Sequence, residues 1–255
     1  MKAFALQSGS NGNCIYVETG GIRLLFDAGI NGTQAEEKLA ARGCNIRDID
    51  ALIISHDHGD HIRYAGIYQR KYGLPLYMTR KTCATAKLRH PLGKLHDVRF
   101  FLSDGVMHIN GVSVHAIPTP HDGADGAVFV VSSGEKRLGI MTDLGHPFEG
   151  LGKVIDTLDA VFIESNYDPD MLAKGPYPVS LRKRIAGPEG HLSNLEAAEL
   201  LGAASHGRLK WACLSHLSEH NNKTSLAIET HRKIVHPRLP LYIASRYAPS
   251  QILSV

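Results

Sequence analysis

Three histidines and two aspartates fall within seven residues of this chain, at positions 55–61, which run Ser-His-Asp-His-Gly-Asp-His. An apolar run at residues 51–54 precedes them, as expected for a buried strand, and a helical pattern follows at residues 62–72. His56 and His58 are two positions apart, so in an extended segment both imidazoles point to the same side. Loops at the carboxyl ends of strands are where α/β proteins place their sites.

Asp60 and His61 follow where the chain must turn into the helix, so their side chains can face a second point, close to the one that His56 and His58 face. Neutral imidazole and carboxylate together are ligands for zinc, iron or manganese. The alternative, a solvated polar turn, does not account for this spacing after a buried strand. The motif therefore predicts a metal site.

Three further candidate ligands, His121, Asp143 and His216, each follow an apolar run typical of a buried strand. Strands of one sheet can bring such ends together although they are far apart in the sequence. Two metal ions about 3.5–4 Å apart can clamp a phosphodiester and generate hydroxide at neutral pH. One assignment places His56, His58 and His121 on the first ion, Asp60, His61 and His216 on the second, and Asp143 between them.

The remaining histidines are interpreted more simply. His191 precedes a helix whose N-terminus could receive an anion, so substrate contact and helix-end packing both stay open. Six others are interpreted as surface or core residues: His90, His96, His206, His220, His231 and His236.

Length and composition allow one large domain or two small ones, since the chain has 255 residues of which 43% are hydrophobic. We expect a single domain over residues 1–255. No run of 18 apolar residues occurs, so we expect no membrane span. The four cysteines are scattered without a Cys-x-x-Cys pair, which favours free thiols in a reducing cytoplasm.

Charge is distributed unevenly, although the formal net charge is only +3. Residues 63–99 contain nine basic side chains and one acid, Asp97, and therefore sum to +8, which leaves −5 for the rest. A cationic surface beginning at the metal motif suits a polyanionic substrate. An ordinary solvated basic face is the alternative.

The order of the expected elements indicates an α/β fold in which strands alternate with helices. The loop at residues 8–13 is either a plain hairpin turn or an anion-binding nest. Residues 175–178 form the best candidate for a further loop. Strands are expected at residues 3–7, 14–18, 22–26, 51–54, 75–78, 98–102, 106–109, 112–117, 128–131, 137–141, 160–163, 209–214 and 239–243, and helices at 33–41, 62–72, 80–89, 193–205 and 223–235.

This motif set resembles the metallo-β-lactamase superfamily, on residues 55–61 with His121, Asp143 and His216. Within it the chain is similar to the YycJ/WalJ-like group over essentially its whole length. The residues that carry the narrower resemblance are the runs at 8–14, 164–168, 190–194 and 216–222.

The resemblance implies a four-layer αβ/βα sandwich with two divalent metal ions, held by the seven ligands assigned above. It also implies that Asp60 orients the attacking hydroxide, and that His191 and Tyr167 are candidates for contact with the leaving group or a phosphate. The group usually has histidine where this chain has Tyr167, and tyrosine, with an ordinary pKa of about 10, is the poorer proton shuttle near pH 7.

The implied function is hydrolysis of a phosphodiester by a metal-bound hydroxide, as in a DNA exonuclease, with nucleic acid and foremost DNA as substrate. One alternative is a small-molecule hydrolase of the same fold, acting on a cyclic phosphodiester, a thioester or a lactone. The other is a regulatory protein with a structural metal site. The sequence leaves open the metal, DNA versus RNA, exo versus endo cleavage, polarity and the oligomeric state.

Overall fold

The computed structural model describes residues 1–205 and 207–255, so His206 lies outside the described residues. These residues form two compact units. Unit 1 comprises residues 1–118, 123–127 and 245–254, and unit 2 comprises residues 119–122, 128–244 and Val255. Each unit consists of segments that are not contiguous in the sequence, so no single boundary in the chain separates the two units. The single domain expected from the sequence stays a prediction.

Unit 1 is built on a mixed sheet in the order β14-β1-β2-β3-β4-β5-β6. The strands β1, β2 and β3 pair antiparallel, whereas β3, β4, β5 and β6 run parallel to one another. The parallel half brings the carboxyl ends of four strands to one edge of the sheet. The strands are β1 (Lys2–Gln7), β2 (Cys14–Thr19), β3 (Ile22–Phe26), β4 (Ala51–Ile53), β5 (Leu76–Met78), β6 (Val98–Phe100) and β14 (Leu253–Ser254), and an antiparallel hairpin of β7 (Val106–Ile109) and β8 (Val112–Pro118) belongs to the same unit.

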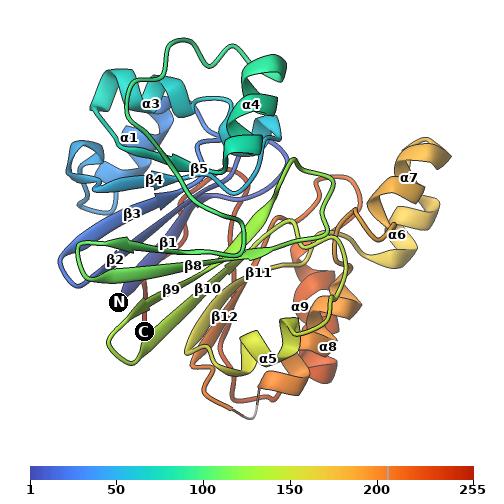
Figure 1. The fold of residues 1–255 in the computed structure, drawn as a ribbon. Coiled ribbons are helices and arrows are strands. Elements are labelled where there is room, and N and C mark those ends of the chain that lie inside the picture. The colour runs from blue at the N-terminus through green and yellow to red at the C-terminus, as the bar shows by residue number, and fades with distance from the viewer. Residues whose placement is uncertain (206) are drawn as a thin grey trace. The chain divides into compact units, whose positions relative to one another are not determined.

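The helices of unit 1 begin and end where the sequence supplies caps. Asn31 accepts a hydrogen bond from the Gln34 amide at the start of α1, and Thr79 does the same for α4 through Thr82. Figure 1 shows α1, α3 and α4, drawn in blue to teal, beside the strands β3, β4 and β5. The helices are α1 (Gly32–Ala40), α2 (Gly59–Ile62), α3 (Ala65–Tyr72) and α4 (Arg80–Arg89), with a 3-10 turn at Ile46–Asp48.

Unit 2 is built on a second mixed sheet, in which β9 pairs antiparallel with β10 and β10 to β13 are parallel. Helix α8 packs on α5 and α9, and Figure 1 shows α6 and α7 as a pair that stands away from β11 and β12. The elements are β9 (Ala127–Ser133), β10 (Lys136–Met141), β11 (Ala160–Glu164), β12 (Trp211–Ser215), β13 (Leu241–Ile243), α5 (Leu151–Asp156), α6 (Pro169–Lys174), α7 (Val179–Ile185), α8 (Asn194–Ala204) and α9 (Thr224–Ile234).

Most expected elements are confirmed to within a few residues, including the capping box of Ser193 and Glu196 at the start of α8. The single helix expected at residues 62–72 is wrong. The chain forms α2 and α3 instead, and the Tyr64 amide between them donates to the Ala28 carbonyl, a tertiary contact that interrupts the helical ladder. The helices α5, α6 and α7 and the short strand β14 were not expected.

No helix among the described residues combines the length and the apolarity that crossing a membrane requires.

Two glycines in helices give a matched test of packing. A Cβ at Gly66 in α3 would lie 1.9 Å from the Leu92 carbonyl oxygen, whereas one at Gly152 in α5 would meet no atom within 4 Å. We expect Gly66→Ala to lower the free energy of unfolding by about 1–3 kcal/mol, because the contact must be relieved. Gly152→Ala should raise it by about 0.5–1 kcal/mol through helix propensity. Urea unfolding measures both, and a stabilising Gly66→Ala would contradict the close approach.

His231 provides a pH test of the core of unit 2. Its side chain is fully buried in α9, where Nδ1 donates to the Ala227 carbonyl at 2.8 Å. Burial, assisted by the charge of Arg232, lowers the pKa of His231 to about 4. Between pH 6.5 and 4 the unfolded chain therefore binds a proton that the folded chain refuses, and stability present above pH 6.5 is lost as the pH falls.

We expect His231 to account for a loss of about 3 kcal/mol between pH 6.5 and pH 4, an order of magnitude set by the pKa difference. The difference in unfolding free energy between wild type and His231→Phe, followed against pH, measures it. His220→Gln, at an exposed histidine, should track the wild type. Parallel pH profiles for wild type and His231→Phe would count against this assignment.

Candidate metal centre

The loop after β4 gathers three imidazoles in unit 1. His56 and His61 are buried, with 2% and 0% of their surface exposed, and His58 is half-buried as the N-cap of α2. The ring centroid of His56 lies 4.6 Å from that of His58 and 4.2 Å from that of His61. The rings converge as their spacing predicts.

Asp27 holds the deepest of these rings. This residue follows β3 and is 4% exposed, and its Oδ2 lies 2.7 Å from Nδ1 of His61. The backbone amide and the hydroxyl of Ser55 donate to Oδ1 of the same carboxylate, at 2.8 and 2.9 Å. An ionised carboxylate only accepts, so the proton of His61 is assigned to Nδ1, and Nε2 carries the lone pair that a metal requires.

The loop at residues 8–13 braces the same segment from another side. The Asn13 amide nitrogen Nδ2 lies 3.0 Å from Nε2 of His61 and 3.3 Å from Oδ2 of Asp60, and the Asn13 backbone amide donates to the Asp60 carbonyl at 2.8 Å. A Cβ at Gly29 would lie 1.7 Å from that carbonyl oxygen, so only glycine permits this approach. The loop thus positions ligands, a role beyond the plain turn.

Asp57, between the first two histidines, has a structural part. It is fully buried, and its carboxylate accepts from Arg89 and from the Ala124 amide, each at 2.6 Å. Its carbonyl oxygen lies 2.9 Å from Nε2 of His90. The metal-ligand loop is thereby tied to the end of α4.

Unit 2 contributes His121, Asp143 and His216, which follow β8, β10 and β12 and are each at most 5% exposed. Oδ1 of Asp143 lies 3.7 Å from Nε2 of His121 and 3.4 Å from Nδ1 of His216. The separation of 3.7 Å is what two ligand atoms on one ion show, since each bond is about 2.0–2.2 Å. The three predicted residues of this unit are brought together.

Glu164, at the end of β11, organises the unit 2 ligands. It is fully buried and accepts from His191 Nδ1 at 2.6 Å, and its Oε1 lies 3.2 Å from Nδ1 of His216. The amides of Leu144 and Leu192 donate to its other oxygen, at 3.0 and 3.1 Å. Burial alone would raise its pKa, but the charge of His191 and hydrogen bonds from His191 and His216 outweigh this and lower the pKa to about 2.

His121 is fixed in the same way by a backbone acceptor. Its Nδ1 lies 2.7 Å from the Gly190 carbonyl, which can only accept, so Nε2 carries the lone pair. Burial, with the charge of His191 adding to it, lowers the pKa of His121, so the ring is held in the neutral form that binds metal. The donor types, tautomers and ligand separations within each unit fit divalent metal ions.

His191 lies beside two of the candidate ligands of unit 2. It is 15% exposed on its side chain, and its ring centroid is 4.9 Å from that of His121 and 5.2 Å from that of His216. Ligand atoms of Asp143, Glu164, His191 and His216 all fall within 4.8 Å of one another.

Tyr167 has different surroundings. Its ring packs with Leu172 and Ile185 in a small apolar cluster, and it is 7% exposed. Burial, with the charges of Glu196 and Glu164, raises the pKa of Tyr167 to about 12. Its part in catalysis stays a prediction.

Two carboxylates that contribute to the site were missed from the sequence. Asp27 and Glu164 stand directly after β3 and at the end of β11, the same location as the predicted ligands, and this was the available signal. Asp27, Asp143 and His216 also share backbone φ angles of +55° to +66°, a conformation that non-glycine residues adopt at a cost. That strain marks the strand ends at which side chains are aimed for function.

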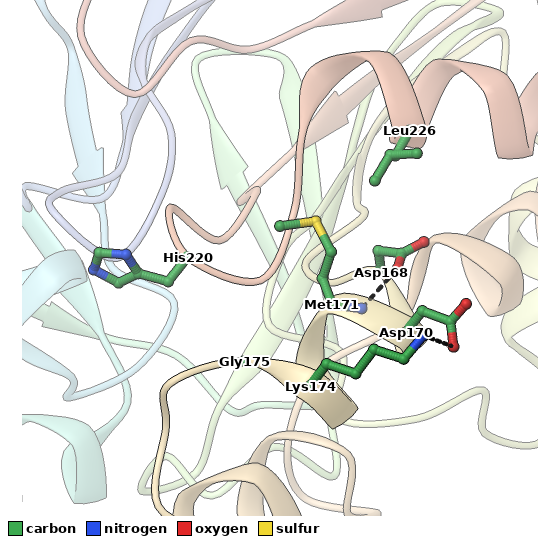
Figure 2. A pocket seen from close by; sticks show the side chains of 7 residues that line it. All are labelled: Asp168, Asp170, Met171, Lys174, Gly175, His220 and Leu226. Atoms are coloured by element: carbon green, nitrogen blue, oxygen red, sulfur yellow. Dashed lines mark hydrogen bonds and ion pairs between the residues drawn. The ribbon is translucent and has the colours of Figure 1, made fainter.

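A cavity of about 510 Å³ elsewhere in unit 2 lies along α6, next to Met171, Lys174 and His220. Figure 2 shows the Met171 side chain reaching into the space between His220 and Leu226. The acids at its rim are already engaged: Asp168 caps α6 through the Met171 amide, and Asp170 pairs with Lys174 at 3.7 Å. The cavity is therefore no metal site of its own.

Residues 8–182 match the family model of the metallo-beta-lactamase superfamily. The chain belongs to the metallo-β-lactamase superfamily. It is 34% identical to exodeoxyribonuclease YycJ of Bacillus anthracis over 224 residues, which cover 87% of this chain and 84% of the relative. It is 33% identical to exodeoxyribonuclease WalJ of Streptococcus pneumoniae serotype 2, over 89% of this chain and 85% of the relative.

The solved structure of the metallo-beta-lactamase fold protein YhfI from Bacillus subtilis superposes with a TM-score of 0.75, at 16% identity, covering 99% of this chain and 98% of YhfI. This likeness concerns the fold, and it confirms the αβ/βα class, to which each unit supplies one mixed sheet with helices. Membership in the YycJ/WalJ-like group of the superfamily is likewise confirmed, and the protein is a metal-dependent hydrolase.

Asp27→Asn tests the fixing of His61. The amide offers one acceptor atom in place of two, so Nδ1–H of His61 and the Ser55 donors must compete for it. We expect affinity for zinc or manganese to fall by about 10- to 100-fold, as for other lost partners of ligating histidines. Competition with a chromophoric chelator measures the affinity.

The control is Asp159→Asn, an equally buried aspartate that pairs with Arg208 away from the ligands. It should bind metal like the wild type. Equal losses in the two variants would show a general effect of removing a buried charge and would refute the specific role of Asp27.

Proposed function

We propose that the protein is a dinuclear metal-dependent phosphodiesterase that removes nucleotides from DNA ends. The observation that carries this proposal is the identity of 33–34% to two exodeoxyribonucleases over most of the length of both partners. The basic block at residues 63–99 supports a polyanionic substrate.

The ligand assignment proposed here follows the resemblance, with His56, His58 and His121 for one ion and Asp60, His61 and His216 for the other. Asp143 would bridge the two. It is supported within each unit by the rings of His61, His121 and His216, whose Nδ1 faces a protein acceptor so that the lone pair is assigned to Nε2. When bound, two divalent ions would acidify a water molecule and neutralise charge on the phosphate.

The side chains around these ligands have distinct tasks in this proposal. Asp60, 22% exposed on its side chain, is assigned to accept a hydrogen bond from the attacking water and orient it. His191 is oriented by Glu164, which accepts from its Nδ1 at 2.6 Å, and its side chain is 15% exposed, so we assign His191 the contact with the leaving oxygen. Tyr167, with its raised pKa, is assigned at most a hydrogen bond to a phosphate.

The compartment proposed for this activity is the cytoplasm. Cys14 and Cys213 are fully buried, and burial raises the pKa of the Cys213 thiol to about 12. Such thiols behave as small core residues in a reducing compartment.

Nuclease assays test the proposal directly. With manganese or zinc supplied, we expect end-labelled linear duplex DNA to be degraded while covalently closed circular DNA stays intact. The double variant Asp60→Ala, His61→Ala should lose at least about 100-fold in rate, because both a ligand and the water-orienting carboxylate are gone. The matched control is His115→Ala, at an exposed histidine of β8, which should retain wild-type activity.

Further substrates identify the substrate class that the protein hydrolyses. They are single-stranded DNA, RNA, a cyclic phosphodiester, a thioester and a lactone. If fully metallated protein cleaves no nucleic acid but hydrolyses one of the small substrates, the nuclease proposal is refuted in favour of a small-molecule hydrolase. If it hydrolyses nothing, a structural metal site in a regulatory protein takes its place.

A further inference from the structure

An exposed apolar patch occupies the outer end of the unit 1 sheet. β6 is the last strand in the order of that sheet, and Phe100 at its end is 43% exposed. Leu102 and Val106 follow with 73% and 51% exposed. Together with Tyr77, Met107 and His108 they line a hollow of about 420 Å³. A cluster of exposed apolar residues marks a binding surface more often than is expected by chance.

Guanidinium groups cover the aromatic rings of this patch. The guanidinium carbon of Arg80 lies 4.5 Å from the ring centroid of Phe100, and that of Arg99 lies 5.3 Å from the ring centroid of Tyr77. Arg99 also donates to the Tyr77 hydroxyl at 2.7 Å, which fixes that pair. Planar guanidinium groups and aromatic rings both accept the face of a nucleobase, and the same arginines attract phosphates.

The patch also shares an edge with the metal-ligand loop. β4, β5 and β6 are parallel, so the carboxyl ends of β4, before His56, and of β6, at Phe100, face the same way. Two strand spacings separate them, about 10 Å. Helix α4 links the two places, since Arg80 begins it over Phe100 and Arg89 ends it on Asp57 of the loop.

A second copy of the chain is the other partner that could bind here, because an exposed edge strand can pair with another strand. β6 is only three residues long and overlaps the end of the block of net charge +8 at residues 63–99. An isologous pairing through this edge would set two such blocks against each other. Charge therefore favours a polyanion with apolar faces.

We propose that Tyr77, Phe100, Leu102 and Val106 form a stacking platform for unpaired bases of a DNA strand, with Arg80 and Arg99 contacting its phosphates. This rests on the proposed function for the nature of the substrate and extends it. The platform binds bases of the strand that enters the metal site, and it favours ends with unpaired nucleotides over blunt ends.

The test compares base-containing and abasic DNA of equal charge. Binding of a twelve-nucleotide thymidine oligomer and of its abasic counterpart is followed by fluorescence anisotropy, with Asp60→Asn present throughout so that cleavage does not interfere. We expect the thymidine oligomer to bind about fivefold or more tightly, the lower range for base stacking. Phe100→Leu should abolish that preference, and Phe100→Trp should keep it.

Leu88→Ala is the matched control, because Leu88 is the 89%-exposed apolar residue on the same basic helix, α4, and lines no part of the hollow. It should leave the preference unchanged. A preference that Phe100→Leu does not alter would overturn the platform, as would a concentration-dependent dimer in sedimentation that Phe100→Leu dissolves.

Activity without the Asp60→Asn substitution separates this inference from the proposed function. DNA cleavage with no preference for bases over abasic sites would overturn the platform and leave the nuclease standing. Base-dependent binding that Phe100→Leu abolishes, without cleavage of DNA, would support the platform and refute the nuclease. Hydrolysis of bis(p-nitrophenyl) phosphate should be equal in wild type and Phe100→Leu, since that ester does not extend to the platform.

Discussion

The fixing of one ring nitrogen in each of several histidines is the constraint on which the rest of this site depends. His61 donates Nδ1–H to Asp27, His121 donates to the Gly190 carbonyl, and His216 faces Glu164. An imidazole that rotates or changes tautomer loses its metal bond, so these acceptors must be as rigid as the ligands. Their rigidity comes from burial: Asp27 and Glu164 are at most 4% exposed, and each is bonded to backbone amides.

A buried carboxylate without hydrogen-bond donors costs free energy. This explains why several segments of each unit supply donors to Asp27 or Glu164. Glu164 receives four contacts from three parts of unit 2, and Asp27 receives donors from Ser55 and His61 at the end of the next strand. The positive φ angles at Asp27, Asp143 and His216 add a second cost in free energy at the ends of strands. The buried strands that precede these three residues supply packing free energy that keeps these conformations.

The sequence predicted the convergence of these side chains within each unit for a specific reason. His56, His121, Asp143 and His216 each follow an apolar run, and the carboxyl ends of buried strands are recognisable from composition alone. Asp27, Asn13 and Glu164 were missed in that role. A residue that positions a ligand does not stand at a characteristic distance from it in the sequence. Their significance arises from tertiary contacts between segments up to 52 residues apart, as for Glu164 and His216.

The errors in the secondary structure have the same origin. α5, α6 and α7 are only six or seven residues long and have too few turns to display an apolar period. The helix expected at residues 62–72 has the right composition, but the Ala28 carbonyl takes the amide of Tyr64 and the Ala28 amide bonds the His61 carbonyl. Hydrogen bonds from the loop after β3 thereby interrupt the helix next to His61 and hold that residue in place. Local propensity was overridden at this place by tertiary hydrogen bonds that hold His61 from outside its own helix.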